Sequence, residues 1–421
     1  MYHLEYARDR LGAFVREIEV LEDGDFPHSH SLEALKRMRE YFHRRLGYLD
    51  RLDEKSNPGL VLQECGNALV AIFEYLPLLG FILRSTNVRN AFEEFRPLLR
   101  LAQQLLQGGH GEPVPETFLI LSSEWDYSPF VYREIRDLPR FVLIGLPAPE
   151  SSNPLLVPLA GHELGHVLWA GRKLEESFRA QLDESVLSLV RNRWEEYSRF
   201  VNVNGLQAER FVNGELAAYP LLKVTSPIAA KQAEELFADF VGIKLFGGSF
   251  FQAFAYLLFP GLFGERSTGY PLVVDRVAYQ VKAGQTYGVT APEGYAALFL
   301  EDNAATRSEY EGFLLEIIDT AIGQVVDSLI CKAGQLVDDS GVPELETDEE
   351  RRILQRFKML VPAEGCKSLG DILNAGWQAY NDPSFWEESP EVSDKRKDIL
   401  KELILKTLEV MEIDHILGKS I

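Results

Sequence analysis

The segment Leu159–Trp169, LAGHELGHVLW, contains two histidines four residues apart, His162 and His166, with Glu163 directly after the first. On a helix, residues four apart lie on one face, one turn along, so both imidazoles can bind one ion. Glu163 lies about 100° around the axis from His162 and can instead reach a water in the ion's open coordination position. This H-E-x-x-H pattern predicts two zinc ligands, His162 and His166, and a carboxylate that accepts a proton from water.

A catalytic zinc ion needs a third protein ligand and keeps a fourth position for water. No histidine follows His166 until His415, so we expect an acid. The segment 231–246, KQAEELFADFVGIKLF, has Glu235 and Asp239 four residues apart, on one face of a helix. We expect Glu235 to be the third ligand. Asp239 can accept a hydrogen bond from the outer ring nitrogen of a ligand histidine.

Simpler interpretations of both segments stay open. The histidine segment can be a core helix whose histidines make internal hydrogen bonds, and the acids of 231–246 can face water. Glu234 competes with Glu235 for the ligand position. The apolar neighbours of these acids favour their burial, however, and a buried pair of carboxylates is costly without a cation. Small residues at 160, 161 and 165 would also let another backbone approach the histidine helix closely.

HELGH followed by EELFAD resembles the gluzincin metallopeptidases, whose second motif is E-x-x-x-D. The later stretch GERSTGYPLVVDRVAYQV resembles the S-T-H-P-x-x-x-x-R segment of the HtpX and CAAX-prenyl protease group through Ser267 to Pro271 and Arg276. Tyr270 replaces the histidine of that segment. A phenol can still donate a hydrogen bond to an oxyanion, but the same residues also suit an ordinary turn before a helix.

The resemblance covers roughly residues 140 to 285 and implies a zinc-dependent peptidase. That protease group is typically embedded in the membrane, whereas this chain shows no convincing span. The helical flanks on either side match no family, so the resemblance does not extend to the substrate. It implies His162, His166 and Glu235 as metal ligands, Glu163 as the general base, Tyr270 and Arg276 as further catalytic residues, and Asp239 behind a ligand histidine.

Composition limits the other possible functions. The chain has 421 residues, of which 46% are hydrophobic, and a net charge of -21. This charge disfavours nucleic-acid phosphates and anionic membranes as partners. The three cysteines, Cys65, Cys331 and Cys366, form no CxxC pair. Their number and spacing argue against a disulfide framework and fit a reducing cytosol, so we expect a cytoplasmic protein. The N-terminus lacks the pattern of a signal peptide.

Two apolar runs, residues 66–84 and 245–264, approach the length of a membrane span. The first contains Glu74 and Pro77, and the second is broken by glycines and by Pro260. We expect both to be buried helices and therefore no membrane span.

Apolar periodicity predicts a mainly helical, α+β protein. Asn153-Pro154 or Pro158 can begin the histidine helix, and Gly171 can end it. The segment 293–310 has no clear pattern. Helices are expected near 3–22, 31–54, 59–83, 88–107, 231–246, 311–337, 368–380 and 392–414, strands at 116–123 and 140–147, and a boundary loop at 108–115.

These features predict three regions, namely an N-terminal helical region at 1–110, a zincin-like core with a small sheet at 111–290, and a C-terminal helical region at 291–421. The expected function is that of a zinc metallopeptidase with one Zn²⁺ per chain and a protein or peptide substrate. The alternative is a zinc-bearing scaffold whose helical flanks bind a partner protein, with little or no turnover.

Overall fold

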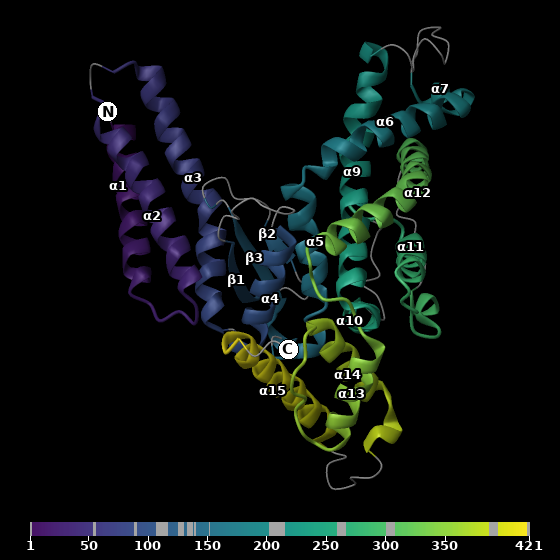
Figure 1. The fold of residues 1–421 in the computed structure, drawn as a ribbon. Helices are drawn as coiled ribbons and strands as arrows, with labels where there is room; N and C mark the ends of the chain where they lie inside the picture. Colours follow the sequence, from purple (N-terminus) through teal and green to yellow (C-terminus); the bar gives the residue numbers. More distant parts are fainter. Residues whose placement is uncertain are drawn as a thin grey trace. The chain divides into compact units, whose positions relative to one another are not determined.

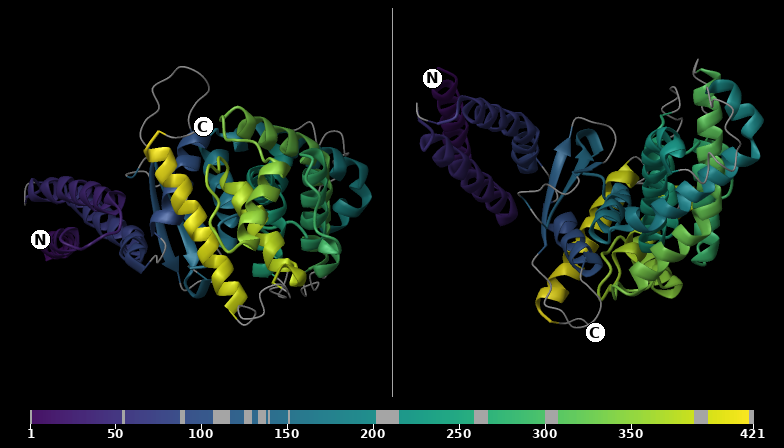
Figure 2. Two further views of the ribbon diagram at one scale, coloured as in Figure 1. Left: turned by 60° about the horizontal axis from the view of Figure 1, so that its bottom comes forward. Right: turned by 90° about the horizontal axis from the view of Figure 1, so that it is seen from above.

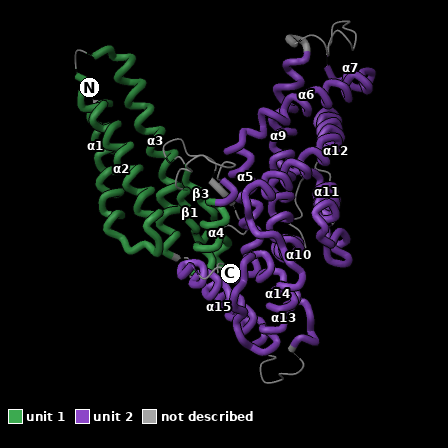
Figure 3. Tube along the Cα trace, in the orientation of Figure 1, with its two compact units in different colours: residues 1–103, 113–152 green, residues 104–112, 153–421 purple. Residues whose placement is uncertain are grey.

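The computed structural model is mainly helical with one small sheet, which confirms the expected α+β class (Figure 1). The chain forms two compact units (Figure 3): unit 1 comprises residues 1–103 and 113–152, and unit 2 comprises residues 104–112 and 153–421. The boundary loop expected at 108–115 lies outside the described residues. The described residues are 2–53, 56–87, 91–106, 117–124, 130–132, 138, 140–150, 152–201, 215–258, 267–299, 308–386 and 395–418.

Long helices dominate unit 1, and they lie where the apolar periodicity predicts them. The first three pack against one another, and residues spaced three or four apart, such as Leu35, Met38 and Phe42, are fully buried between them. Asn57 caps the third helix by accepting hydrogen bonds from the amides of residues 59 and 60. The helices are α1 (Tyr2–Glu22), α2 (Ser29–Asp50), α3 (Pro58–Arg84), the short η1 (Ser85–Asn87) and α4 (Ala91–Leu106).

The sheet has the order β1-β3-β2. Strands β1 (Phe118–Glu124) and β3 (Phe141–Pro147) are parallel and were both expected, whereas β2 (Phe130–Tyr132) is antiparallel to β3 and too short to give a sequence signal. Every residue of β1 and β3 is buried, as in a sheet covered on both faces. The side chains of Phe118 and Phe141 belong to the same hydrophobic core as the first three helices.

Helix α3 corrects the expectation that residues 66–84 are buried. Among the described residues, α3 is the one helix whose length and composition would allow it to cross a membrane. Only 39% of its most apolar 18-residue stretch is buried. One face, which includes Tyr75 and Leu78, lies in the core. Large apolar side chains on the other face are exposed, including Leu62 (61%) and Phe73 (69%). The absence of a membrane span therefore stays a prediction.

Helix α9 (Glu215–Phe246) is the centre of unit 2, and four helices have the most extensive contacts with it. It begins well before the expected helix at 231–246. These neighbours are α5 (Leu159–Gly171), α6 (Leu174–Asn192), α11 (Val273–Thr286) and α12 (Glu309–Asp338), and two shorter helices are α7 (Trp194–Phe200) and α10 (Gly248–Leu258).

Of the two prolines that precede the histidine helix, Pro158 marks its start and Pro154 does not. Asn153 and Pro154 begin a separate 3-10 turn, η3 (Pro154–Leu156), and α5 follows after Pro158. The run at 245–264 is buried over 249–251 and 253–255 of α10, as expected, and its last residues lie outside the described part of the chain. Of the segment 293–310, residues 295–298 form the 3-10 turn η4 (Tyr295–Leu298).

The C-terminal helices share unit 2 with the histidine helix. They are α13 (Thr347–Lys358), α14 (Leu369–Asn381) with η5 (Pro383–Trp386) after it, and α15 (Arg396–Ile416), which packs on α14 (Figure 2). The Trp377 indole donates a hydrogen bond to the carbonyl of Leu155 at 2.9 Å and so ties α14 to η3. The compact units thus group the chain differently from the three expected regions, and that three-part division stays a prediction.

Helices α5 and α9 approach each other closely because glycines face the contact. A Cβ atom added to Gly165 would lie 2.5 Å from the Cα atom of Ala238, and one added to Gly161 would lie 2.7 Å from the ring of Phe246. Small residues at these positions were expected to permit such an approach, and the structure confirms it.

We expect Gly165→Ala to destabilise unit 2 by about 1–3 kcal/mol, because the added methyl group meets backbone that must move. Gly171→Ala is the matched control, since its Cβ atom would meet only a Leu106 methyl group at 4.0 Å. Chemical denaturation of both variants measures the difference. Equal free energies of unfolding in the two variants would contradict the close contact.

A second prediction concerns Asp371, which is buried in the first turn of α14 and accepts the amide hydrogen bond of Glu346 at 3.0 Å. Burial raises its pKa, that amide lowers it, and the carboxylates of Glu350 and Glu349 raise it again, so that the pKa is about 7. The pKa of Asp371 in the folded state exceeds the ordinary value of 3.8. The contribution of protonated Asp371 to the free energy of unfolding is therefore fully present below pH 3.8 and is lost as the pH rises through 7.

Asp371→Asn should therefore stabilise the protein increasingly as the pH rises from about 4 to about 8, because the amide keeps the acceptor oxygen without ionising. We expect the melting temperature of the variant to gain at least roughly 2–4 °C on that of the wild type over this range. Thermal unfolding followed by circular dichroism measures it. Parallel pH profiles for the two proteins would disprove the assignment.

Candidate metal centre

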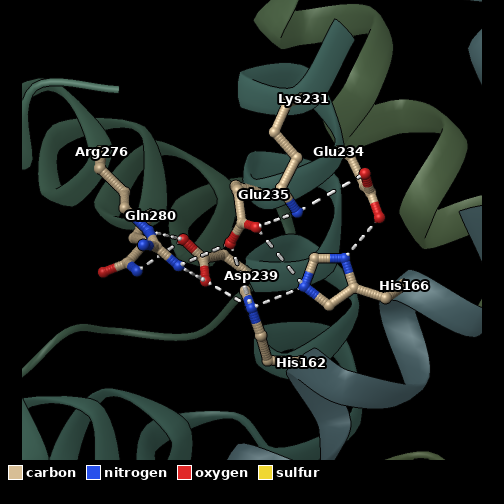
Figure 4. A network of polar contacts seen from close by, with 8 residues as sticks. All are labelled: His162, His166, Lys231, Glu234, Glu235, Asp239, Arg276 and Gln280. Carbon is tan, nitrogen blue, oxygen red and sulfur yellow. Dashed lines mark hydrogen bonds and ion pairs between the residues drawn. The ribbon is translucent and has the colours of Figure 1, made fainter. Parts of the chain in front are cut away.

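The structure brings the three expected ligands together (Figure 4). His162 and His166 lie one turn apart on α5, and their Nε2 atoms are 3.1 Å from each other. Glu235, on α9, places Oε2 at 3.4 Å from the Nε2 atom of His162 and Oε1 at 3.7 Å from that of His166. One potential ligand atom from each residue lies within 4.8 Å of the others. The three side chains therefore converge on one point.

The outer ring nitrogens of both histidines meet carboxylates on α9. His162 Nδ1–H donates to Asp239 Oδ1 at 2.8 Å, and His166 Nδ1–H donates to Glu234 Oε1 at 2.9 Å. A carboxylate accepts but cannot donate, so each Nδ1 atom carries a proton and each Nε2 lone pair can bind a metal. Glu234, the rival of Glu235 in the sequence, contacts the outer nitrogen and so faces away from the point of convergence.

Asp239 is itself held by a buried network. Arg276 donates to it through Nε at 2.6 Å and through Nη2 at 2.8 Å, and Gln280 donates through its amide at 2.9 Å. The hydroxyl of Tyr295 donates to Gln280 Oε1 at 2.5 Å and so orients that amide. Burial opposes ionisation of Asp239, but Arg276 and His162 outweigh it and lower the pKa to about 2. Asp239 is therefore a fixed, charged acceptor for His162.

Arg276 was expected among the catalytic residues, and its contacts define how it acts. Its guanidinium is buried between the rings of Phe254 and Tyr270, at 5.2 and 5.3 Å from their centroids. It pairs with Asp239, and its Nη2 atom lies 3.7 Å from Glu235 Oε2. These contacts fit a positioning residue that fixes Asp239 and, through it, His162.

Tyr270 lies on the segment that leads into α11, at the edge of the same cluster. Its side chain is about half exposed. The charge of Glu235 raises its pKa, and burial raises it further, while Arg276 lowers it. Gln232 ties the segment to α9 by donating to the carbonyl of Thr268 at 3.1 Å. The charges of the site therefore act on Tyr270, and its half-exposed side chain can contact a bound molecule.

Glu163 is buried on α5 beside the two histidines, with 4% of its surface exposed. Burial raises its pKa, the histidines lower it, and the charge of Glu235 raises it again. A carboxyl group that holds a proton more readily than usual is suited to accept and release one near neutral pH.

The site has the properties of a cation site. Glu163, Glu234, Glu235 and Asp239 are all at least 95% buried, and buried carboxylates are costly without compensating charge. Among the described residues, Glu235 Oε2 is buried without a hydrogen-bond partner and faces the Nε2 atoms.

The ionisation of the ligands agrees with this conclusion. Burial lowers the pKa of His162, but its contacts with Asp239 and Glu235 outweigh burial and raise the pKa to about 10. The same histidine charges, with Arg276, lower the pKa of Glu235 against the effect of its burial. His162 therefore carries a positive charge at this point, and a metal ion bound at Nε2 would take the place of that second proton. Two imidazole nitrogens and one carboxylate oxygen are a donor set that zinc favours.

The sequence pattern did not identify four of the residues that complete the site. Lys231 precedes Glu235 by one turn, and its Nζ atom lies 2.5 Å from Glu235 Oε1. Gln280 follows Arg276 by one turn, so helical spacing was a usable signal for both. Glu234 was visible only as a competing ligand. Tyr295 reaches the network from η4, and nothing in its sequence surroundings pointed to it.

No family model, curated protein or solved structure matches this chain. The resemblance to gluzincins therefore rests on the sequence motifs of the chain alone.

The geometry distinguishes Glu235 as a ligand from Glu234 as a partner of His166, and zinc titration of isosteric variants tests this assignment. We expect about one zinc per wild-type chain. Glu234→Gln should weaken binding by about 10–100-fold, because it removes the acceptor behind one ligand. Glu235→Gln should weaken binding more than that, since it replaces the ligand itself. Competition with a chromophoric chelator gives the dissociation constants. The reverse order would refute the assignment.

Proposed function

We propose that this protein is a zinc-dependent metallopeptidase of the gluzincin type. The observation that carries the proposal is the convergence of His162 Nε2, His166 Nε2 and Glu235 Oε2 on one point, with Glu163 buried beside them. The ligand types and the order H-E-x-x-H then E-x-x-x-D support peptide-bond hydrolysis over simple metal storage.

His162, His166 and Glu235 would hold a zinc ion, which would supply a Lewis acid for the peptide carbonyl and would lower the pKa of a water toward about 7. Glu163 accepts the proton of the attacking water and passes it to the leaving amine. Burial, which raises the pKa of Glu163, helps it to keep the proton between these two steps. The charged Asp239 keeps the proton of His162 on Nδ1 and so preserves Nε2 as a ligand.

Tyr270 and Arg276 have separate roles in this proposal. The hydroxyl of Tyr270, raised in pKa and therefore protonated, donates a hydrogen bond to the oxyanion of the tetrahedral intermediate. Arg276 acts through Asp239 and does not need to touch the substrate. The substrate is a protein or peptide. The acidic charge of the chain disfavours nucleic-acid partners, and its three free cysteines fit a cytoplasmic setting.

A second candidate is a zinc-bearing scaffold with little or no turnover. It is favoured by the exposed apolar face of α3, where Leu62, Val70, Phe73 and Leu76 are each about half exposed or more. A patch of this kind is typical of surfaces that bind another protein or a membrane. In this case the zinc site would stabilise unit 2 without performing hydrolysis.

Glu163→Gln separates the two candidates. The variant keeps all three ligands, so it should bind zinc as the wild type does, but any cleavage should fall by at least about 100-fold because the proton acceptor is lost. Zinc content and a comparison of new protein N-termini in cells expressing wild type or variant measure the two effects. Cleavage that survives the substitution would show that Glu163 is not the base, and identical N-termini would favour the scaffold.

A further inference from the structure

Each of the three proposed ligands has a charged partner on α9. Asp239 binds His162 Nδ1 and Glu234 binds His166 Nδ1. The third partner is Lys231, whose Nζ atom lies 2.5 Å from Glu235 Oε1 and 3.6 Å from Glu234 Oε2 (Figure 4). Lys231 is therefore the charged partner of Glu235, as Asp239 and Glu234 are the charged partners of the two histidines.

The two oxygens of Glu235 have different surroundings. Oε1 pairs with the ammonium group, whereas Oε2 is buried without a hydrogen bond among the described residues. Their distances to the histidine Nε2 atoms are nevertheless similar, 3.7 Å from Oε1 to His166 and 3.4 Å from Oε2 to His162. Without the lysine, both oxygens could reach an ion at this point, and a carboxylate that binds through two oxygens would occupy the position needed by water.

We propose that Lys231 is a positioning residue that holds Glu235 by Oε1, so that only Oε2 binds the metal and one coordination position stays open. This inference rests on the zinc-peptidase function proposed above. It assigns the ion pair a role in arranging the metal ligands, in addition to compensating a buried carboxylate charge.

The surroundings of Lys231 support a fixed position for its ammonium group. Its side chain is one-third exposed, while that of Glu235 is 2% exposed, so the lysine reaches inward to a buried acid. Gly269 lies beside its stem: a Cβ atom there would be 3.8 Å from Lys231 Cγ. The segment that carries Tyr270 therefore passes directly over the lysine.

Cobalt substitution tests the inference by a readout other than activity, because the visible absorption of Co²⁺ depends on coordination number and geometry. We expect Lys231→Met to bind one Co²⁺ per chain, with an absorption roughly twofold or more weaker than in the wild type, as the second oxygen of Glu235 joins the metal. Peptide cleavage by the zinc form should fall by about 10–100-fold.

Two further variants serve as controls. Lys231→Arg keeps a cation next to Oε1 and should retain the wild-type spectrum. Lys244→Met is the matched control, because Lys244 is on the same helix and also forms an ion pair, with Asp338 at 2.8 Å, but has no contact with the metal ligands. It should leave the Co²⁺ spectrum and cleavage unchanged.

The outcomes for the inference and for the proposed function can be distinguished. A wild-type protein that takes up neither Zn²⁺ nor Co²⁺ refutes the proposed function itself. A wild-type protein that binds Co²⁺, with the same spectrum in Lys231→Met, overturns the role of Lys231. Lys231→Leu is the second neutral variant, also without a hydrogen-bond donor, in case the methionine variant does not fold. A wild-type spectrum in this variant, or loss of metal from a folded variant, likewise overturns the role.

Discussion

The close contact between α5 and α9 is the constraint on which the site depends. Gly165 faces the backbone of Ala238, and no side chain separates the two helices there. Only at this separation can the imidazoles of α5 reach acids that α9 carries one turn apart. Added atoms at Gly165 would widen this separation, and the three ligand atoms, now within 4.8 Å, would no longer share one ion.

The buried charged groups of the site compensate one another and so hold its side chains in place. Asp239 accepts hydrogen bonds from Arg276 and Gln280, and Glu235 pairs with Lys231. The positive charge of His162 compensates part of the remaining negative charge of the buried acids. A buried set of acids of this kind is stable only when each carboxylate has a donor or a cation. A divalent ion at this point would replace the proton on His162 and leave the outer hydrogen bonds of the histidines intact.

Unit 2 contains every residue of the proposed centre, whereas unit 1 contributes the sheet and the helix with an exposed apolar face. The C-terminal helices are part of unit 2 and not a separate addition, since Trp377 and α14 pack on the segment that precedes the histidine helix. These helices therefore support the site structurally. Because α3 belongs to unit 1, the binding of a partner to its exposed face should be tested separately from the chemistry of the site in unit 2.

Spacing within one helix determined most of what the sequence could show. It placed His162 with His166 and Glu235 with Asp239, and apolar periodicity located the helices of unit 1, because both depend only on residues close along the chain. Tertiary structure decided what depends on separate segments. It placed Glu234 behind His166, on the outer ring nitrogen, brought Tyr295 to Gln280, and left one face of α3 exposed. These outcomes depend on which elements pack together, and a local pattern cannot specify packing partners that are distant in the sequence.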